Sequence, residues 1–293
     1  MRRATIGLAL FVLLIYGAQM RPLLAQAEQH TLTGEFRTHK SFHSQFLASD
    51  RDILVYLPPG YETEKKRRYP VLYLHDGQNL FDGATSFIKG AEWQMDETAE
   101  ALIAEKAVEP LIIVGIYNAG KDRIDEYTPT PDPKYKGGKA DAYGRMLVEE
   151  LKPFIDAHYR TLRGAKQTGL GGSSLGGLVS LYLALKYPTV FGKVAVFSPS
   201  VWWDKRVILR EVEILKKRPR LRIWLDTGTR EGRDETEAAE TTADARRLRD
   251  ALKEKGWKEG KDLQYFEAVG AEHNERAWQQ RVGPMLKFLF PRK

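Results

Sequence analysis

The chain has 293 residues, 42% of them hydrophobic and 29% charged, which is the composition of an ordinary globular protein with enough material for one large core. It contains no cysteine, which excludes a disulfide framework and thiolate chemistry. Lys and Arg outnumber Asp and Glu by 46 to 39, but the basic residues are spread among acids as on a solvated surface, so the sequence does not indicate a nucleic-acid partner.

The amino terminus has the pattern of a secretory signal. Two arginines precede an uncharged apolar run at 4–18, and the small residues at 25–27 (Ala-Gln-Ala) fit a cleavage site. We therefore expect residues 1–27 to be a signal peptide and residues 28–293 to form a secreted or periplasmic protein with a net charge of +4, from 43 bases and 39 acids. An uncleaved membrane anchor is the alternative, although the run is short for a bilayer span. No other segment of the sequence predicts a membrane span.

Two segments at the start of the mature chain alternate apolar and polar residues, at 34–49 and 51–61, and predict two antiparallel edge strands. Beyond them, continuous apolar runs alternate with amphipathic helical patterns, which is typical of a parallel sheet covered by helices on both faces. Buried strands are predicted at 69–77, 110–118, 166–172, 192–200, 221–228 and 263–269. Helices are predicted at 91–108, 141–159, 175–187, 205–217, 241–256 and 274–290.

This alternation continues without a linker, a change of composition or an internal repeat. We therefore expect a single doubly wound α/β domain with a mostly parallel sheet over residues 28–293. Its one long irregular connection, at 118–141, is rich in Gly, Pro, Asp and Lys. Because long loops at the carboxyl edge of such sheets often build binding sites, this loop is a candidate wall or lid.

The turn GSSLG at 172–176 lies between a predicted strand and a predicted helix and fits the pattern Gly-x-Ser-x-Gly around Ser174. A nucleophile on such a sharp turn needs small neighbours, which Gly172 and Gly176 supply, and the start of the following helix favours developing negative charge. A plain tight turn or a phosphate cradle is the alternative. However, no Gly-Lys-Ser/Thr occurs, and the turn comes too late in the chain for a dinucleotide fingerprint. We predict that Ser174 is a nucleophile.

A serine hydroxyl needs a base and an orienting acid, which in this setting follow in the order Ser, Asp or Glu, His. Of the six histidines, His273 is the one that falls between the last predicted strand and the closing helix, so we predict that it is the general base. The region around the end of the strand at 221–228 offers Asp226, Glu231 and Asp234. We prefer Glu231, because Asp226 still belongs to the strand pattern, and place Asp234 second. A solvated loop charge is the alternative for each.

Backbone donors are needed for the negative oxygen of a tetrahedral intermediate. One usually follows the nucleophile and the other lies in the loop after an early strand. These positions correspond to the N–H groups of Leu175 and of Gln78 in YLHDGQNLFDG.

With these residues in place, the chain resembles the putative esterase family of α/β-hydrolases, which includes enterochelin (siderophore), feruloyl and acetyl-xylan esterases. The resemblance covers nearly the whole mature chain. It is carried by the motifs VYLPPGY, YPVLYLHDGQNLF, VGIYNAGKDRIDEYTP, GLGGSSLGGLVSLYLALKYP, FSPSVWW, DTGTREG and EHNERAW.

The resemblance implies an α/β-hydrolase fold with Ser174 as nucleophile, Glu231 as acid and His273 as base. Several relatives have Asp where this chain has Glu, so the acid is the least secure of the three. The resemblance also implies that Trp202 and Trp203 lie beside the serine, with core packing as the alternative. The same resemblance suggests that Arg123 of the 118–141 loop faces the substrate.

We therefore predict a secreted serine esterase that cleaves a carboxylic ester through an acyl-enzyme, with no metal or cofactor. Its substrate would be a small siderophore ester or an acylated or feruloylated carbohydrate. An acyltransferase, or a non-catalytic binding module of the cell envelope, is the alternative on the same fold. A metallohydrolase lacks support, because the sequence has no His-x-x-x-His pair or close His and Asp cluster. No feature of the sequence specifies an oligomeric state.

Overall fold

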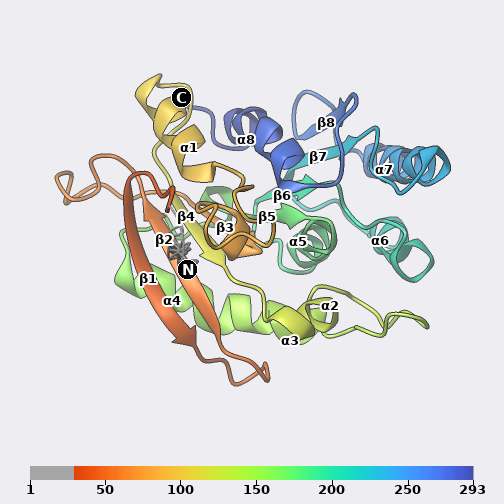
Figure 1. Cartoon of the computed structure of the whole chain (residues 1–293), viewed down its shortest axis with the longest axis horizontal. Coiled ribbons are helices and arrows are strands. Elements are labelled where there is room, and N and C mark those ends of the chain that lie inside the picture. Colours follow the sequence, from red (N-terminus) through yellow and green to blue (C-terminus); the bar gives the residue numbers. More distant parts are fainter. Residues whose placement is uncertain (1–29, 293) are drawn as a thin grey trace, which may run out of the picture.

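An eight-stranded sheet organises the part of the chain that this computed structural model describes, residues 30–292. Its strand order is β1-β2-β4-β3-β5-β6-β7-β8 (Figure 1). The strands are β1 Glu35–Phe42, β2 Arg51–Leu57, β3 Val71–His75, β4 Ile112–Ile116, β5 Thr168–Ser173, β6 Lys193–Phe197, β7 Arg222–Gly228 and β8 Leu263–Ala268. The predicted signal peptide at 1–27 lies outside the described residues.

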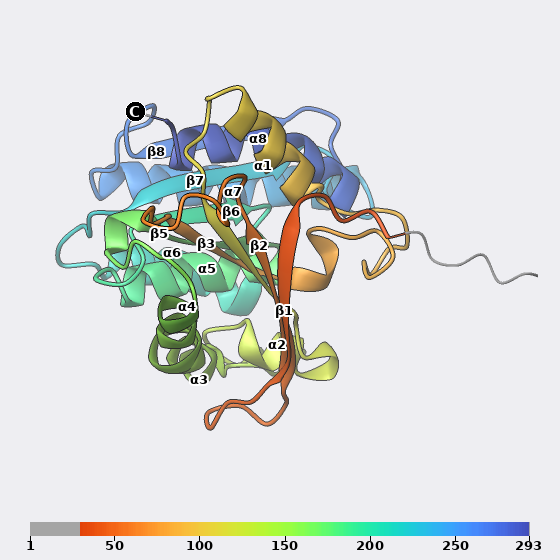
Figure 2. The same ribbon diagram turned by 90° about the vertical axis from the view of Figure 1, so that its left-hand side faces the viewer.

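Helices cover both faces of the sheet. The helices are α1 Met95–Ala104, α2 Arg123–Glu126, α3 Ala140–Arg145, α4 Lys152–His158, α5 Leu175–Lys186, α6 Trp203–Glu213, α7 Glu235–Glu254 and α8 Glu275–Leu289. Figure 2 shows α1 and α8 on one side of the sheet and α3, α4 and α5 on the other. Within residues 30–292, no helix is both long and apolar enough to cross a membrane.

The sheet is antiparallel at its amino-terminal end and parallel from β3 and β4 through to β8. This arrangement confirms the predicted mostly parallel sheet with antiparallel first strands. The prediction of two edge strands was wrong for β2, which pairs with both β1 and β4. The physical reason is the run Ile53–Leu57, which is continuously apolar and buried on both faces, as an interior strand requires.

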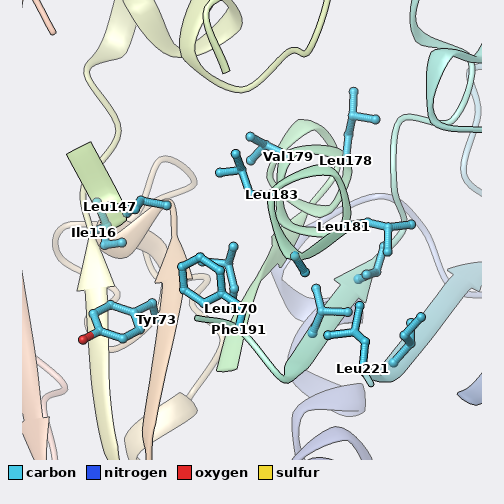
Figure 3. Close-up of a cluster of buried hydrophobic side chains, with 14 of the residues drawn as sticks. Tyr73, Ile116, Leu147, Leu170, Leu178, Val179, Leu181, Leu183, Phe191 and Leu221 are labelled. Atoms are coloured by element: carbon cyan, nitrogen blue, oxygen red, sulfur yellow. The ribbon is translucent and has the colours of Figure 1, made fainter. Parts of the chain in front are cut away.

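Alternate residues of β2, β3, β4, β6 and β7 enter two separate hydrophobic clusters, one on each face of the sheet. Val71 and Tyr73 of β3 point into the larger cluster under α3 to α7, whereas Leu72 and Leu74 point into the cluster under α1 and α8. Figure 3 shows part of the larger cluster, where residues of α5 such as Leu183 lie over Leu170 of β5. The sheet and both clusters fall within residues 35–290.

Four predicted helices differ from the observed ones. The helix predicted at 241–256 begins six residues earlier, at Glu235, and the helix predicted at 205–217 runs from Trp203 to Glu213. The helix predicted at 91–108 begins only at Met95, because the N–H groups of Trp93 and Met95 donate to the carbonyls of Asn79 and Leu80 and hold the preceding residues in a loop. The helix predicted at 141–159 is helical from Ala140 to His158, but it contains a π-helical stretch at Met146–Leu151 between α3 and α4.

The long connection at 118–141 is more ordered than its composition suggested. It contains a 3₁₀ turn at Gly120–Asp122 and the short helix α2. Glu126 of α2 forms a buried ion pair with Arg51 of β2, with Nη1 to Oε2 at 2.7 Å. The loop is therefore fastened to the sheet at this point.

Candidate active site

Ser174 lies on a sharp turn between β5 and α5. Its backbone angles, φ 58° and ψ −122°, fall where residues with a side chain rarely occur, which is typical of a strained functional turn. The turn is fixed because the N–H of Ser174 donates to the carbonyl of Phe197 at 3.0 Å and the N–H of Ser200 donates to the carbonyl of Ser174 at 3.1 Å. A side chain at Gly172 would place its Cβ 3.1 Å from the carbonyl carbon of Gly176, so the close approach of the two glycines leaves little room for one.

His273 and Glu231 meet in the loops that follow β8 and β7. The ring Nδ1 of His273 lies 3.1 Å from Oε2 of Glu231. Glu231 is buried, whereas 39% of the His273 side chain is exposed. A carboxylate that binds Nδ1–H selects the tautomer in which Nε2 is free to accept a proton, as a general base requires.

Ser174, Glu231 and His273 all line one cavity of about 1000 Å³ at the carboxyl edge of the sheet. Within the described residues, no hydrogen bond joins Ser174 to His273. The hydroxyl of Ser174 instead lies 3.3 Å from that of Ser200, which lines the same cavity. Catalytic hydrogen bonds often tighten only when substrate binds. The observation that counts for catalysis is therefore that the three side chains line the same cavity.

The two other candidate acids have different roles. Asp226 is fully buried, and its carboxylate accepts from the indole N–H of Trp224 at 2.6 Å and from Arg281 at 2.7 Å. Asp234 caps α7 by accepting from the N–H of Glu237 at 2.9 Å. Of the three acids, Glu231 alone contacts His273 within residues 30–292.

A buried network of polar side chains binds the oxygen of Glu231 that does not contact His273. The hydroxyl of Ser198 donates to Oε1 of Glu231 at 2.5 Å and accepts from the indole of Trp278 and the guanidinium of Arg281, at 3.0 and 3.2 Å. Arg281 is also paired with Asp226, whose pKa is raised to about 6 because burial outweighs the charge of the arginine. This network occupies Oε1 of Glu231 and leaves Oε2 for His273.

The two predicted oxyanion donors lie on neighbouring turns. Leu175 is the first residue of α5, where backbone N–H groups have no partner within the helix. Gln78 lies in the 3₁₀ turn after β3, and its carbonyl and side chain bind Thr85 and the N–H of Asn118. Neither residue lines the cavity that holds Ser174. The two turns lie close together. A Cβ added at Gly176, which follows Leu175, would lie 3.4 Å from Cβ of His75, the last residue of β3.

The two tryptophans after β6 pack against each other, with ring centroids 5.6 Å apart, but they differ in exposure. Trp202 is 47% exposed and lines the cavity. Trp203 is 1% exposed and donates its indole N–H to the carbonyl of Thr130 at 2.8 Å, so it packs in the core and does not reach the cavity. The expectation that both lie beside the serine is therefore corrected for Trp203. Tyr135, from the tip of the 118–141 loop, meets Trp202 edge-on with ring centroids 5.7 Å apart.

Arg123 faces Asp76 instead of the cavity. Its Nε and Nη2 each lie 2.7 Å from a carboxylate oxygen of Asp76, and its guanidinium also lies over the ring of Tyr127 at 5.0 Å. Asp76 is buried, and burial alone would raise its pKa, but the charge and hydrogen bonds of Arg123 hold the pKa below its ordinary value. Arg123 thus forms an ion pair that fastens the loop and does not line the cavity, and its contact with substrate stays a prediction.

Sequence reasoning missed Ser198, Ser200, Tyr135 and Arg281. A signal existed for Ser198 and Ser200, because Ser-Pro-Ser directly follows a buried strand at the edge that carries the serine turn. Arg281 was also detectable, since it shares the apolar face of α8 with Trp278, and a buried arginine needs a carboxylate partner. Tyr135 had no signal beyond its place in a long loop. Among the described residues, no three His, Asp or Glu side chains gather as a metal site would require.

A family model described as "Putative esterase" matches residues 44–289. Among curated proteins, the "Uncharacterized protein YjcH" of Bacillus subtilis (strain 168) is 32% identical over 255 residues, which cover 85% of this chain and 95% of that protein. The "Ferri-bacillibactin esterase BesA" of the same organism is 29% identical over 162 residues, covering 50% of this chain and 52% of that protein.

Solved structures show the same fold. The BES protein from Bacillus cereus matches with a TM-score of 0.69 at 23% identity, covering 90% of this chain and 98% of that one. A ferulic acid esterase matches with a TM-score of 0.65 at 18% identity, covering 87% of this chain and 98% of that one. These likenesses confirm the expected α/β-hydrolase fold.

Proposed function

The chain belongs to the putative esterase family and is a carboxylic ester hydrolase, and from this premise we propose that it works as a serine hydrolase through a Ser174, Glu231 and His273 triad. The observation that carries the proposal is the Glu231–His273 hydrogen bond at the wall of the cavity that also holds Ser174. A buried acid on one ring nitrogen, with the other nitrogen free, is the arrangement that lets an imidazole take the proton of a serine.

In the first half of the reaction, Oγ of Ser174 attacks the ester carbonyl while Nε2 of His273 takes the hydroxyl proton. The N–H groups of Leu175 and Gln78 stabilise the oxyanion. The tetrahedral intermediate then collapses, the bond to the alcohol breaks, and His273 gives its proton to the leaving oxygen. An acyl group remains on Ser174.

The second half repeats these steps with water. His273 takes a proton from the water, whose oxygen attacks the acyl carbonyl. The second tetrahedral intermediate then collapses, the bond between the acyl carbon and Oγ breaks, and His273 returns the proton to Oγ of Ser174 as the carboxylic acid leaves. Glu231 stabilises the imidazolium that forms twice in each cycle. Ser200, which contacts the resting hydroxyl of Ser174, holds the nucleophile toward the cavity between cycles.

Replacement of Ser174 tests the proposal. Ser174→Ala is expected to lower kcat for p-nitrophenyl acetate by about 10⁴-fold or more, because the nucleophile is lost. Ser173→Ala is the matched control, since this neighbouring serine is buried in β5 and does not line the cavity. A fluorophosphonate probe followed by mass spectrometry is expected to label Ser174. Turnover retained in Ser174→Ala, with the label elsewhere, would reject the triad.

For the substrate, we propose an ester that carries an aromatic ring. Trp202 lines the cavity, is 47% exposed and contacts Tyr135, which is 43% exposed, so its ring offers a face on which a planar ring can stack. The relatives named as a ferri-bacillibactin esterase and a ferulic acid esterase suggest two sources for the ring, a catechol siderophore or a feruloylated carbohydrate. Hydrolysis of an enterobactin-type trilactone compared with methyl ferulate distinguishes them. Activity on neither, with p-nitrophenyl acetate still cleaved, would contradict the aromatic substrate alone.

A further inference from the structure

Charge is distributed unevenly between the two edges of the parallel sheet. Because β3 to β8 are parallel, the segments that precede them share one edge and the segments that follow them share the other. The preceding segments are 58–70, 105–111, 159–167, 187–192, 214–221 and 255–262. They hold fifteen Lys and Arg against six Asp and Glu, a net charge of +9.

The opposite edge, which carries the candidate active site, is slightly acidic. Its segments are 76–94, 117–139, 174, 198–202, 229–234 and 269–274. They hold eight bases against ten acids, a net charge of −2. Basic residues that look scattered along the sequence are therefore gathered at the edge opposite the catalytic cavity.

Direct contacts join several of the basic segments into one surface. Tyr69 forms a β-bridge with Thr161, which links the turn before β3 to the turn before β5. The N–H of Arg222 donates to the carbonyl of Gly192 at 3.0 Å, which links the turns before β6 and β7. Arg218 forms an ion pair with Asp262 at 2.5 Å, which continues the surface to the turn before β8.

Many of these cations are not held by a neighbouring group. Eight exposed side chains on this edge make no hydrogen bond or ion pair with residues 30–292: Lys66, Lys106, Lys166, Lys216, Lys217, Arg220, Lys258 and Lys261. Elsewhere, exposed bases are commonly paired, as Arg246 is with Glu267. Unpaired lysines in contiguous turns repel one another, and a surface of fixed anions would relieve that repulsion.

We propose that this basic edge is a docking surface for anionic phospholipid. Of the large apolar side chains exposed in the described residues, Ile214 lies on this edge, in the same turn as Lys216 and Lys217, and it is 69% exposed. An apolar side chain amid lysines is suited to lipid headgroups. Single-stranded nucleic acid is less suited, because binding it uses aromatic platforms, and the exposed aromatic residues of the described chain lie outside these six segments.

The position of the surface also fits catalysis. Docking through the amino edge of the sheet leaves the cavity, at the carboxyl edge, open to substrate from solution. The inference does not depend on the identity of the triad, because it rests on charges at the other edge of the sheet.

Vesicle binding tests the proposal. The protein starting at Glu28 retains the whole described sheet and core, and is mixed with phosphatidylcholine vesicles with or without about one third phosphatidylglycerol. We expect binding only to the anionic vesicles, and weaker binding at high salt, because salt screens exposed charges. In Lys216→Glu/Lys217→Glu, the affinity is expected to fall by about tenfold or more, since each lysine near such a surface is worth roughly fivefold.

A matched control distinguishes the effect of where the lysines lie from the effect of the protein's net charge on vesicle binding. Lys40→Glu/Lys121→Glu changes the net charge equally on exposed, unpaired lysines near the carboxyl edge, and is expected to alter affinity by less than about twofold. Both variants should cleave p-nitrophenyl acetate like the parent. Equal losses of vesicle affinity in both variants, no preference for anionic vesicles, or tighter binding to heparin or duplex DNA at the same salt would overturn the proposal.

Discussion

Two buried carboxylates, Asp76 and Glu231, follow strands of the same sheet and are held in different ways. Both oxygens of Asp76 bind the permanent cation of Arg123, and one also accepts from Asn118 at 2.7 Å. Oε1 of Glu231 binds the hydroxyl of Ser198 and the N–H of Gly228 and lies 3.5 Å from Nη2 of Arg281, whereas Oε2 binds the partly exposed imidazole of His273. Both acids have an arginine beside them, but Arg123 binds both oxygens of Asp76, whereas Glu231 keeps one oxygen for an imidazole at the wall of the cavity, which fits it for catalysis.

The largest expected effect is the loss of activity when Glu231 is replaced. Glu231→Gln is expected to lower kcat/KM by about 10³- to 10⁴-fold, because the amide no longer stabilises the imidazolium or selects its tautomer. Asp234→Asn is the control in the same loop and should keep activity within about twofold. Kinetics with p-nitrophenyl acetate measure both. An inactive Asp234→Asn beside an active Glu231→Gln would move the acid to Asp234.

The network under Glu231 is the next place to test. Arg281→Met removes the cation that Asp226 and Glu231 share, and because Asp226 is the nearer of the two buried acids we expect the free energy of unfolding to fall by about 3–5 kcal/mol. Urea denaturation at pH 7 measures the loss. Asp226→Asn added to Arg281→Met should recover much of it, because an uncharged amide avoids the buried charge. No recovery in the double variant would mean that Arg281 stabilises the fold in another way.

A smaller loss of stability is expected when the ion pair between Arg123 and Asp76 is broken. Arg123→Met should lower the free energy of unfolding by about 2–3 kcal/mol, less than Arg281→Met because 26% of the Arg123 side chain is exposed. Trypsin should then cleave the 118–141 loop faster. The ratio of the KM values for neutral and anionic esters should stay unchanged. Unchanged stability with a raised KM for anionic esters alone would identify Arg123 as a substrate residue.

The smallest effect concerns His75, which lies beside Asp76. Burial lowers the pKa of His75 to about 3, below the value of about 6.5 in the unfolded chain. The unfolded state therefore binds more protons between these values, so the stability is fully present above pH 6.5 and is lost as pH falls. At pH 5.5 the expected loss is about 1 kcal/mol relative to pH 8. His75→Gln, measured by urea denaturation, should lack this loss, and parallel pH profiles for the two proteins would contradict it.

Much of the architecture could be predicted because it follows from local patterns. The apolar runs place each strand of the parallel sheet, and the Gly-x-Ser-x-Gly turn between β5 and α5 can be recognised within five residues. The order of serine, acid and histidine along the chain also narrows the candidate site to a few loops, since the fold places the carboxyl ends of its strands at one edge.

Side-chain burial, and contacts between residues far apart in the chain, depend on the tertiary structure. Adjacent tryptophans have nearly the same sequence context, yet Trp202 lines the cavity and Trp203 is buried, because Trp203 packs under Trp202 and donates its indole N–H to Thr130 of a distant loop. Arg123 meets Asp76, 47 residues away, only because the loop folds back onto the end of β3.

The residue types, the strand and helix periods and the serine turn are properties of short segments, and so they can be read from the amino acids in order. Which acid contacts His273, which arginine is buried, and which lysines share an edge depend on distances between segments far apart in the chain. Charge and hydrogen bonding act over a few ångströms in space, so these assignments were decided only when the parallel strands brought their turns together.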